Sequence, residues 1–166
     1  MEEVNAAFGE AARIAPFDLD RILEQGPAIL MALQPIAYFD TRHREPSANP
    51  DQAEDQSSVG APFYRPRTLQ DFFMWDPGTI KPNVDESRIA GVEGAIWCES
   101  VESESDLFFL IVPRLPGLLE KAWSQPAESL DAAWDDYASR LAVHDGLWEH
   151  RNWNYFRSSA IWADPR

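Results

Sequence analysis

The sequence predicts an α/β fold with parallel strands. Two short apolar runs, within residues 27–40 and 89–97, each precede segments with helical spacing. Continuous apolar runs of this length are typical of strands buried on both faces of a parallel sheet, and their alternation with helices indicates an α/β arrangement. The 166 residues suit one domain or part of a larger one. They are too few for a complete (β/α)8 barrel, which needs about 250 residues.

The first forty residues are predicted to contain two helices and a strand. Residues 2–15 carry apolar side chains at helical spacing up to a proline, which ends the helix. Residues 18–26 predict a second short helix, from an aspartate cap to a closing glycine. The apolar run that follows is expected to form a single buried strand that continues to residue 40.

The middle of the chain changes character. Residues 41–66 are polar, contain prolines and show no period, so we expect a long loop of the kind that is usually functional or mobile. A short aromatic helix is predicted over 68–75, ended by the Asp-Pro-Gly sequence at 76–78. Residues 89–97 are expected to form the second buried strand, with glycines that suggest close backbone approach.

Two helical segments are predicted further on. Residues 103–106 resemble a capping box, and apolar residues then recur at helical spacing as far as Trp123. Pro113 and Pro116 are expected to bend or break that helix near its start. The last helix is predicted over 129–142, with an apolar face formed by Leu130, Trp134, Tyr137 and Leu141.

The tail, residues 143–166, is rich in tryptophan and polar residues and is expected to end irregularly. Two strands do not make a stable parallel sheet by themselves, because such sheets need more neighbours and cover on both faces. We therefore expect the chain to be the end of something larger. Its exposed strand edge predicts poor stability of the isolated chain.

Composition and charge exclude several classes of function. With 28 acidic and 14 basic residues the net charge is −14, and no basic patch favours a nucleic-acid partner. The N-terminus is acidic, with no signal-peptide pattern, and no apolar stretch approaches the ~20 residues of a membrane span. The chain is therefore predicted to be soluble and to bind neither nucleic acid nor membrane. Its compartment and oligomeric state stay open.

Cysteine and histidine give no sign of a metal or a cofactor. The single Cys98 excludes an internal disulfide and any multi-cysteine zinc site, and it is expected to be a small buried hydrophobe. His43, His144 and His150 lie in polar segments without metal-ligand spacing, so each is expected at the surface. The acidic run 99–106 is expected to be a solvated loop and helix start.

Two clusters could carry chemistry, Tyr38-x-Asp40 and Trp97-x-Glu99, and each lies at the predicted C-terminal end of a strand. In a parallel α/β barrel that end holds the active site. Strand residues two apart point to the same side, so each aromatic ring is expected beside its carboxylate. Such a pair suits a sugar, whose CH face stacks on the ring while its hydroxyls bond to the carboxylate. The alternative is structural, since Asp40 could simply begin a turn.

Four motifs resemble glycoside hydrolase family 20. Residues 91–99 (Gly-Val-Glu-Gly-Ala-Ile-Trp-Cys-Glu) and 112–124, which open on Val-Pro-Arg, resemble the last strand and last helix of the family. Residues 26–40, ending in Tyr-Phe-Asp, resemble its seventh strand, and 68–77, ending in Trp-Asp-Pro, resemble the segment joining the two strands. The similarity covers about residues 20–125, and the order and spacing of the four motifs make it specific.

The resemblance implies a fold and a domain plan. Residues 1–142 would be the C-terminal portion of a (β/α)8 TIM barrel, an incomplete barrel that holds strands 7 and 8 with their helices. The long segment 41–66 would be a loop of that catalytic domain, and residues 143–166 would be a C-terminal tail.

The resemblance also implies a function. The family comprises β-N-acetylhexosaminidases and relatives, which release terminal non-reducing β-linked N-acetylhexosamine by a retaining, substrate-assisted mechanism without a cofactor. Tyr38 would be the catalytic residue that orients the N-acetyl group. Asp40 and Glu99 would bind distal hydroxyls of the terminal sugar, and Trp97 would form the apolar floor under the ring. The implied partner is an N-acetylhexosamine-containing glycan or oligosaccharide.

The sequence also differs from the family pattern at positions that bear on the expected activity. The acid/base Asp-Glu pair in its Gly-Gly context is missing, and Asp85-Glu86 lacks that context and is given no catalytic role. Phe63 and Tyr64 stand where the family usually has a tryptophan, so the substrate-binding wall is expected to be altered. The isolated chain is therefore expected to be inactive. Two alternatives stay open: a lacto-N-biosidase-like member, and a non-catalytic carbohydrate-binding or interaction remnant.

Overall fold

The structure is a computed structural model, and it describes residues 24, 26, 28–79 and 84–163. The helix expected over 2–15 lies outside the described residues, as does nearly all of the helix expected over 18–26. The described elements are strands β1 (Ile29–Met31) and β2 (Ile89–Val92), 3-10 turns η1 (Pro50–Gln52) and η2 (Glu86–Arg88), and helices α3 (Gln34–Ala37), α4 (Ala53–Ser58), α5 (Leu69–Phe73), α6 (Glu104–Ile111), α7 (Arg114–Trp123), α8 (Leu130–Ala142), α9 (Asp145–His150) and α10 (Ser159–Trp162).

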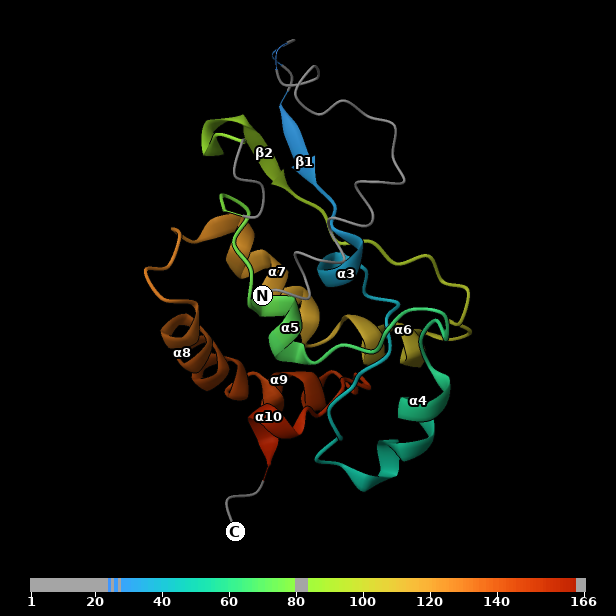
Figure 1. Cartoon of the computed structure of the whole chain (residues 1–166). Helices are drawn as coiled ribbons and strands as arrows, with labels where there is room; N and C mark the ends of the chain where they lie inside the picture. The colour runs from blue at the N-terminus through green and yellow to red at the C-terminus, as the bar shows by residue number, and fades with distance from the viewer. Residues whose placement is uncertain (1–23, 25, 27, 80–83, 164–166) are drawn as a thin grey trace.

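The two strands pair in parallel, as the alternation of strands and helices predicted. Ile29 pairs with Ile89, and after a shift in register Met31 pairs with Val92. Figure 1 shows β1 and β2 side by side at one end of the molecule, with α3 just beyond the end of β1 and α8, α9 and α10 at the opposite end. The chain is thus an α/β arrangement with a small sheet at one end.

Both strands are shorter and less buried than predicted. Pro35 lies in the first turn of α3 and interrupts the apolar run, because it lacks the N–H that a continuing strand would donate. The chain pairs again only at Tyr38, through an isolated parallel bridge to Ala95. The side chain of Leu30 is 53% exposed, since the described residues supply too few neighbours to cover the sheet.

The segment 41–66 is more ordered than the predicted loop. It contains η1 and α4, and parallel bridges join Thr41 to Ala61 and His43 to Arg67. The buried Gln52 side chain donates to the carbonyl oxygen of Tyr155 at 2.8 Å. None of the residues of α4 is buried, so the helix has no apolar face that the sequence could reveal.

The helices of the second half confirm the sequence prediction. Ser103 and Asp106 form the expected capping box at the start of α6. The chain breaks at the cis peptide bond before Pro113, which separates α6 from α7, and Pro116 is tolerated in the first turn of α7. The apolar face of α8 is buried at Trp134, Tyr137 and Leu141. Thr68 caps the predicted aromatic helix, α5.

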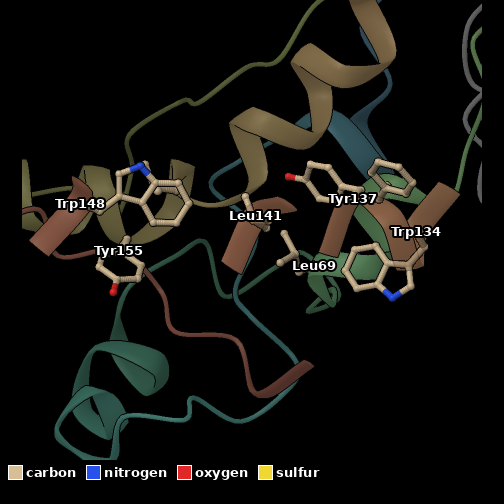
Figure 2. Close-up of a cluster of buried hydrophobic side chains, with 8 residues drawn as sticks. Leu69, Trp134, Tyr137, Leu141, Trp148 and Tyr155 are labelled. Atoms are coloured by element: carbon tan, nitrogen blue, oxygen red, sulfur yellow. The ribbon is translucent and has the colours of Figure 1, made fainter. Parts of the chain in front are cut away.

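The tail is not irregular, because it forms α9 and α10 and enters the main core. Figure 2 shows Trp148 and Tyr155 on one side of this core, with Leu141 and Leu69 between them and Tyr137 and Trp134. The aromatic residues of the tail follow no helical or strand period, which is why the sequence did not predict their burial.

A second apolar cluster packs beneath the carboxyl ends of the strands. It joins α3 to α5 and α7 through buried side chains of Leu33, Ile36, Ala37, Phe39, Phe72, Trp75 and Leu118. This cluster fixes the backbone from which the strand-end side chains project. Within the described residues, no helix has both the length and the apolar character needed to cross a bilayer.

The prediction for His43 was wrong, whereas His144 and His150 are exposed as expected. His43 is buried and stacks on Phe156, with ring centroids 3.7 Å apart. Its Nε2 lies 2.9 Å from the carbonyl oxygen of Phe109. Burial, aided by the charge of Arg114, holds the pKa of His43 well below its ordinary value. The polar neighbours of His43 in the sequence concealed this position.

Replacing His43 should make the free energy of unfolding less dependent on pH below pH 6.5. In that range the unfolded chain binds a proton at residue 43 that the folded chain does not. The free energy of unfolding of the native protein therefore falls, as pH is lowered, by up to about 1.4 kcal/mol per pH unit. We expect His43→Gln to lose this slope between pH 6.5 and 5 in urea unfolding. His144→Gln is the matched control and should keep it; an unchanged slope in His43→Gln would contradict the assignment.

Candidate functional site

The two predicted clusters meet where the parallel strands end. The N–H of Phe39 donates to the carbonyl oxygen of Ala95 at 2.7 Å, and the N–H of Ala95 donates to that of Ala37 at 2.9 Å. This pairing places Tyr38 next to the segment that leads to Trp97, and the centroids of the two rings are 5.9 Å apart. The structure therefore brings together residues that are 59 positions apart in the sequence, from Tyr38 to Trp97.

Four aromatic rings line this end of the sheet. The Tyr38 ring lies edge-on to Tyr64, with centroids 6.2 Å apart, and Tyr64 in turn packs against Phe63 at 4.6 Å. Trp97 and Phe63 are 58% and 64% exposed, so their faces are open to a ligand. All the predicted aromatic residues of the site thus lie in one continuous row, which we call the aromatic wall (Tyr38, Trp97, Tyr64 and Phe63).

Asp40 lies beneath this wall, fully buried. Neither carboxylate oxygen accepts a hydrogen bond of good geometry from a described residue, although the backbone N–H groups of Asp40 and Trp97 lie near enough to lower its pKa. Burial outweighs them, so the pKa of Asp40 is raised, and the charge of Glu99 raises it further while Arg114 opposes it. A buried carboxylate without a partner is costly to the folded state.

Glu99 is exposed and follows a strained residue. Cys98 has a φ of +64°, in the left-handed region that a side chain disfavours, and it is exposed rather than buried as predicted. The strand β2 has already ended at Val92, so the same-side argument for Trp97 and Glu99 does not apply here. The charge of Glu99 nevertheless contributes to raising the pKa of Asp40.

Tyr64 is the residue of the aromatic wall whose pKa responds to the carboxylates. Its pKa is raised by burial first, and then by the charges of Asp40 and Glu99 and by Tyr38. Ring contacts thus join four of the predicted site residues, and the charges of Asp40 and Glu99 act on the pKa of one of them, Tyr64.

Arg114, which the sequence analysis did not single out, is the fully buried cation beneath the site. Its guanidinium also lies 4.3 Å from the ring centroid of Phe72, and burial lowers its pKa to about 9. The signal was present in the Val-Pro-Arg motif. The guanidinium donates to the main-chain carbonyl oxygens of Phe39 (Nη1, 3.0 Å), Thr41 (Nη1), Arg42 (Nη2, 3.2 Å) and Arg67 (Nη2, 3.3 Å).

Asp85 and Glu86 lie away from this site. Asp85 caps η2, and the hydrogen bonds from Ser87 lower the pKa of its carboxyl group. The turn leads into the amino end of β2, whereas the aromatic wall lies beyond the carboxyl end. The only adjacent Asp-Glu pair thus serves as a helix cap.

The arrangement suits an uncharged ligand with one apolar face and several hydroxyls. The exposed indole of Trp97 can stack on the apolar face, and the exposed carboxylate of Glu99 can accept hydrogen bonds from hydroxyl groups. The described residues contain no group of three His, Cys, Asp or Glu side chains placed to hold a metal ion. A separate cavity of about 300 Å³ lies between β2 and α7, beside Lys121, and contains none of the predicted site residues.

Comparison with known proteins points to one family. The model of the glycosyl hydrolase family 20 catalytic domain matches residues 12–126. A β-N-acetylhexosaminidase of Cellulomonas fimi is 27% identical over 143 residues, which are 86% of this chain and 26% of the relative. A β-hexosaminidase of Akkermansia muciniphila is 24% identical over 76% of this chain and 23% of the relative. The chain thus spans about a quarter of the length of these curated relatives.

Solved structures agree with this result. The N-acetyl-β-hexosaminidase of Streptomyces plicatus in complex with Thio-NAglucal superposes with a TM-score of 0.69 at 25% identity, over 85% of this chain and 26% of that one. The β-N-acetylhexosaminidase of Streptomyces coelicolor A3(2) gives a TM-score of 0.69 at 26% identity, over 83% of this chain and 25% of that one.

Removing the Arg114 guanidinium should destabilise the fold strongly. Arg114→Gln would leave several buried carbonyl oxygens without donors, so we expect the free energy of unfolding to fall by about 3 kcal/mol or more. Urea unfolding measures this loss. Arg44→Gln is the matched control, because it removes an exposed ion pair to Asp71 (3.4 Å) and should cost less than about 1 kcal/mol. Equal losses in the two variants would contradict this role.

Asp40→Asn should stabilise the chain at neutral pH. The pKa of folded Asp40 is raised above its ordinary 3.8, so stability of the native protein is lost as pH rises through that raised pKa. The amide does not ionise, so the free energy of unfolding of the variant, measured in urea, should rise relative to that of the native protein between pH 3 and pH 7. The exposed control Glu93→Gln should show no such rise. A fall in the variant's relative free energy of unfolding with rising pH would show that the carboxylate stabilises the fold.

Proposed function

The chain belongs to glycosyl hydrolase family 20, and we propose that it is the C-terminal part of the catalytic domain of a β-N-acetylhexosaminidase. The proposed substrate is a glycan with a terminal non-reducing β-linked N-acetylhexosamine. The observation that carries the proposal is the meeting of Tyr38, Trp97 and Asp40 at the carboxyl ends of two parallel strands.

We assign the two strands to positions 7 and 8 of a (β/α)8 barrel. Two features support this assignment: the parallel pairing of β1 and β2, and the match of this chain to about a quarter of each relative. Residues 1–142 would then belong to the catalytic domain and residues 143–166 would be its C-terminal tail, packed against the same core through Trp148 and Tyr155.

Each site residue has a proposed role in binding the terminal sugar. Trp97 forms the floor under the ring, and its 58% exposure supports this role. Asp40 and Glu99 accept hydrogen bonds from the distal hydroxyls. Phe63 and Tyr64 form the side wall, where Tyr64 packs edge-on to Tyr38. Holding the sugar in this way fixes the reacting groups in place, which lowers the entropic part of the barrier.

Tyr38 would act on the reacting group itself. In a substrate-assisted reaction the N-acetyl carbonyl oxygen forms a bond to the anomeric carbon as the glycosidic bond breaks, and water later opens the resulting ring with retention. The Tyr38 hydroxyl would donate to that carbonyl oxygen and aim it at the anomeric carbon. The leaving oxygen needs a proton from an acid, and neither member of the Asp85-Glu86 pair is placed to supply it.

We therefore propose that the isolated chain binds the sugar without cleaving it. One alternative is a lacto-N-biosidase-like member that releases a disaccharide, which the 64% exposure of Phe63 favours because the wall is open on that side. The other is a non-catalytic carbohydrate-binding or interaction remnant, which the lack of an acid/base pair favours. The first alternative, and the second in its carbohydrate-binding form, keep a glycan as the ligand, whereas an interaction remnant would not.

Binding and turnover of the 166-residue chain test the proposal separately. We expect isothermal titration with N-acetylglucosamine to detect binding that Trp97→Ala weakens by about tenfold, since stacking area is lost. Trp123→Ala is the matched control, because Trp123 is 86% exposed on α7 and outside the site. A chromogenic N-acetyl-β-glucosaminide should not be hydrolysed. Binding that is absent, or equally affected by both variants, would contradict the sugar site; measurable turnover would contradict the predicted inactivity.

A further inference from the structure

The loop that carries Phe63 and Tyr64 returns to the candidate sugar site at Gly60. The N–H of the next residue, Ala61, donates to the carbonyl oxygen of Asp40 at 2.7 Å. Gly60 and Ala61 are both buried, so their backbone polar groups need partners within the protein. These two residues therefore set where the wall side of the site begins.

Gly60 leaves no room for a side chain at this point. Its φ is +105°, and a Cβ atom there would lie 2.8 Å from the Cγ of Arg42 and 3.1 Å from the carbonyl oxygen of Asp40. The carbonyl oxygen of Gly60 also accepts from the Nε of Arg42 at 2.9 Å. The loop thus packs backbone against backbone on the segment that carries Asp40.

A hydroxyl group joins the same point to the turn that carries Trp97 and Glu99. The N–H of Gly60 donates at 3.1 Å to the Oγ of Ser100, the residue directly after Glu99. The three residues before Ser100 are all exposed, so burial of their side chains contributes little to holding the turn in place. The hydrogen bond from Gly60 to Ser100 is therefore a main link between the turn and the loop.

Apolar packing brings the loop and the turn together beside this hydrogen bond. Val59 is 7% exposed and belongs to a buried cluster that includes residues of α6, and Ile96 and Val101 pack against that cluster from either side of the turn. Apolar packing is not directional, so it does not fix how the two segments are aligned. The hydrogen bond from Gly60 to Ser100 is directional and supplies that alignment.

We propose that Ser100 is a positioning residue of the candidate sugar site. Its hydroxyl group holds the loop of Phe63 and Tyr64 at a fixed distance from the turn of Trp97 and Glu99, so that wall and floor can contact one sugar together. Ser100 acts through the backbone of the loop and need not contact the sugar. The proposal rests on the proposed function and adds to it a residue that positions the others.

Isothermal titration of the 166-residue chain with N-acetylglucosamine tests the proposal. Ser100→Ala removes the acceptor of a buried N–H, and we expect it to weaken binding about fivefold. Ser100→Thr keeps the hydroxyl group and should restore most of the affinity. Ser57→Ala is the matched control, because the exposed Ser57 hydroxyl donates to the carbonyl oxygen of Glu54 within α4 of the same loop. Its affinity should equal that of the native chain.

A double-mutant cycle separates positioning from a general structural effect. If Ser100 aligns the wall, Ser100→Ala should weaken binding by less than about twofold once Tyr64→Ala has removed the ring that contacts Tyr38. The same loss in both backgrounds would show that the hydroxyl group acts independently of the wall, and it would overturn the proposal. Native affinity in Ser100→Ala would overturn it as well.

Hydrogen exchange of the chain without sugar keeps this inference distinct from the proposed function. Ser100→Ala should speed amide exchange in residues 59–67 and 96–101, and Ser57→Ala should speed it in neither segment. Unchanged exchange in Ser100→Ala would overturn the proposal. Faster exchange in a chain that binds no N-acetylglucosamine would support the link made by Ser100 and contradict the sugar site.

The native chain decides if Ser100→Ala does not fold, as judged by far-UV circular dichroism. The Gly60 amide, followed by NMR, should then exchange far more slowly than an amide of an unstructured peptide, because its hydrogen is held by the Ser100 hydroxyl group. Exchange at the rate of an unstructured peptide would overturn the proposal.

Discussion

The buried guanidinium of Arg114 is the constraint on which the site depends. It donates to main-chain carbonyl oxygens on both sides of Asp40, at Phe39 and Thr41, and reaches Arg67 across the loop. These hydrogen bonds fix the backbone around Asp40, beyond the end of β1. They take the place of the sheet hydrogen bonds that a longer strand would have made there. A single cation thus orders both the turn that carries Asp40 and the segment at Arg67.

The site is built from groups that disfavour folding. Asp40 is a buried carboxylate without a good hydrogen-bond partner, and Cys98 has a left-handed backbone. Each costs free energy that the packed helices must offset, and such costs gather at functional sites. The aromatic cores on either side of α5, one of which contains Trp134 and Trp148, supply that offset.

The features that depend on neighbouring residues in the chain could be predicted from the sequence. The cap at Ser103, the break at Pro113 and the apolar face of α8 follow from short-range chemistry, and the meeting of Tyr38 with Trp97 follows from parallel strand ends. Arg114 and His43 were missed because long-range packing decides their burial: the polar neighbours of His43 give no sign of it, and the Val-Pro-Arg motif marks Arg114 without showing what it binds. Pro35 was visible, but its effect on the strand was underestimated.

The most direct test of the central claim is a crystal structure of the 166-residue chain with N-acetylglucosamine. We expect the sugar ring on the indole of Trp97, its N-acetyl oxygen within hydrogen-bond distance of the Tyr38 hydroxyl, and its hydroxyls on Asp40 and Glu99. A sugar bound instead in the cavity between β2 and α7, beside Lys121, would contradict the proposed sugar site.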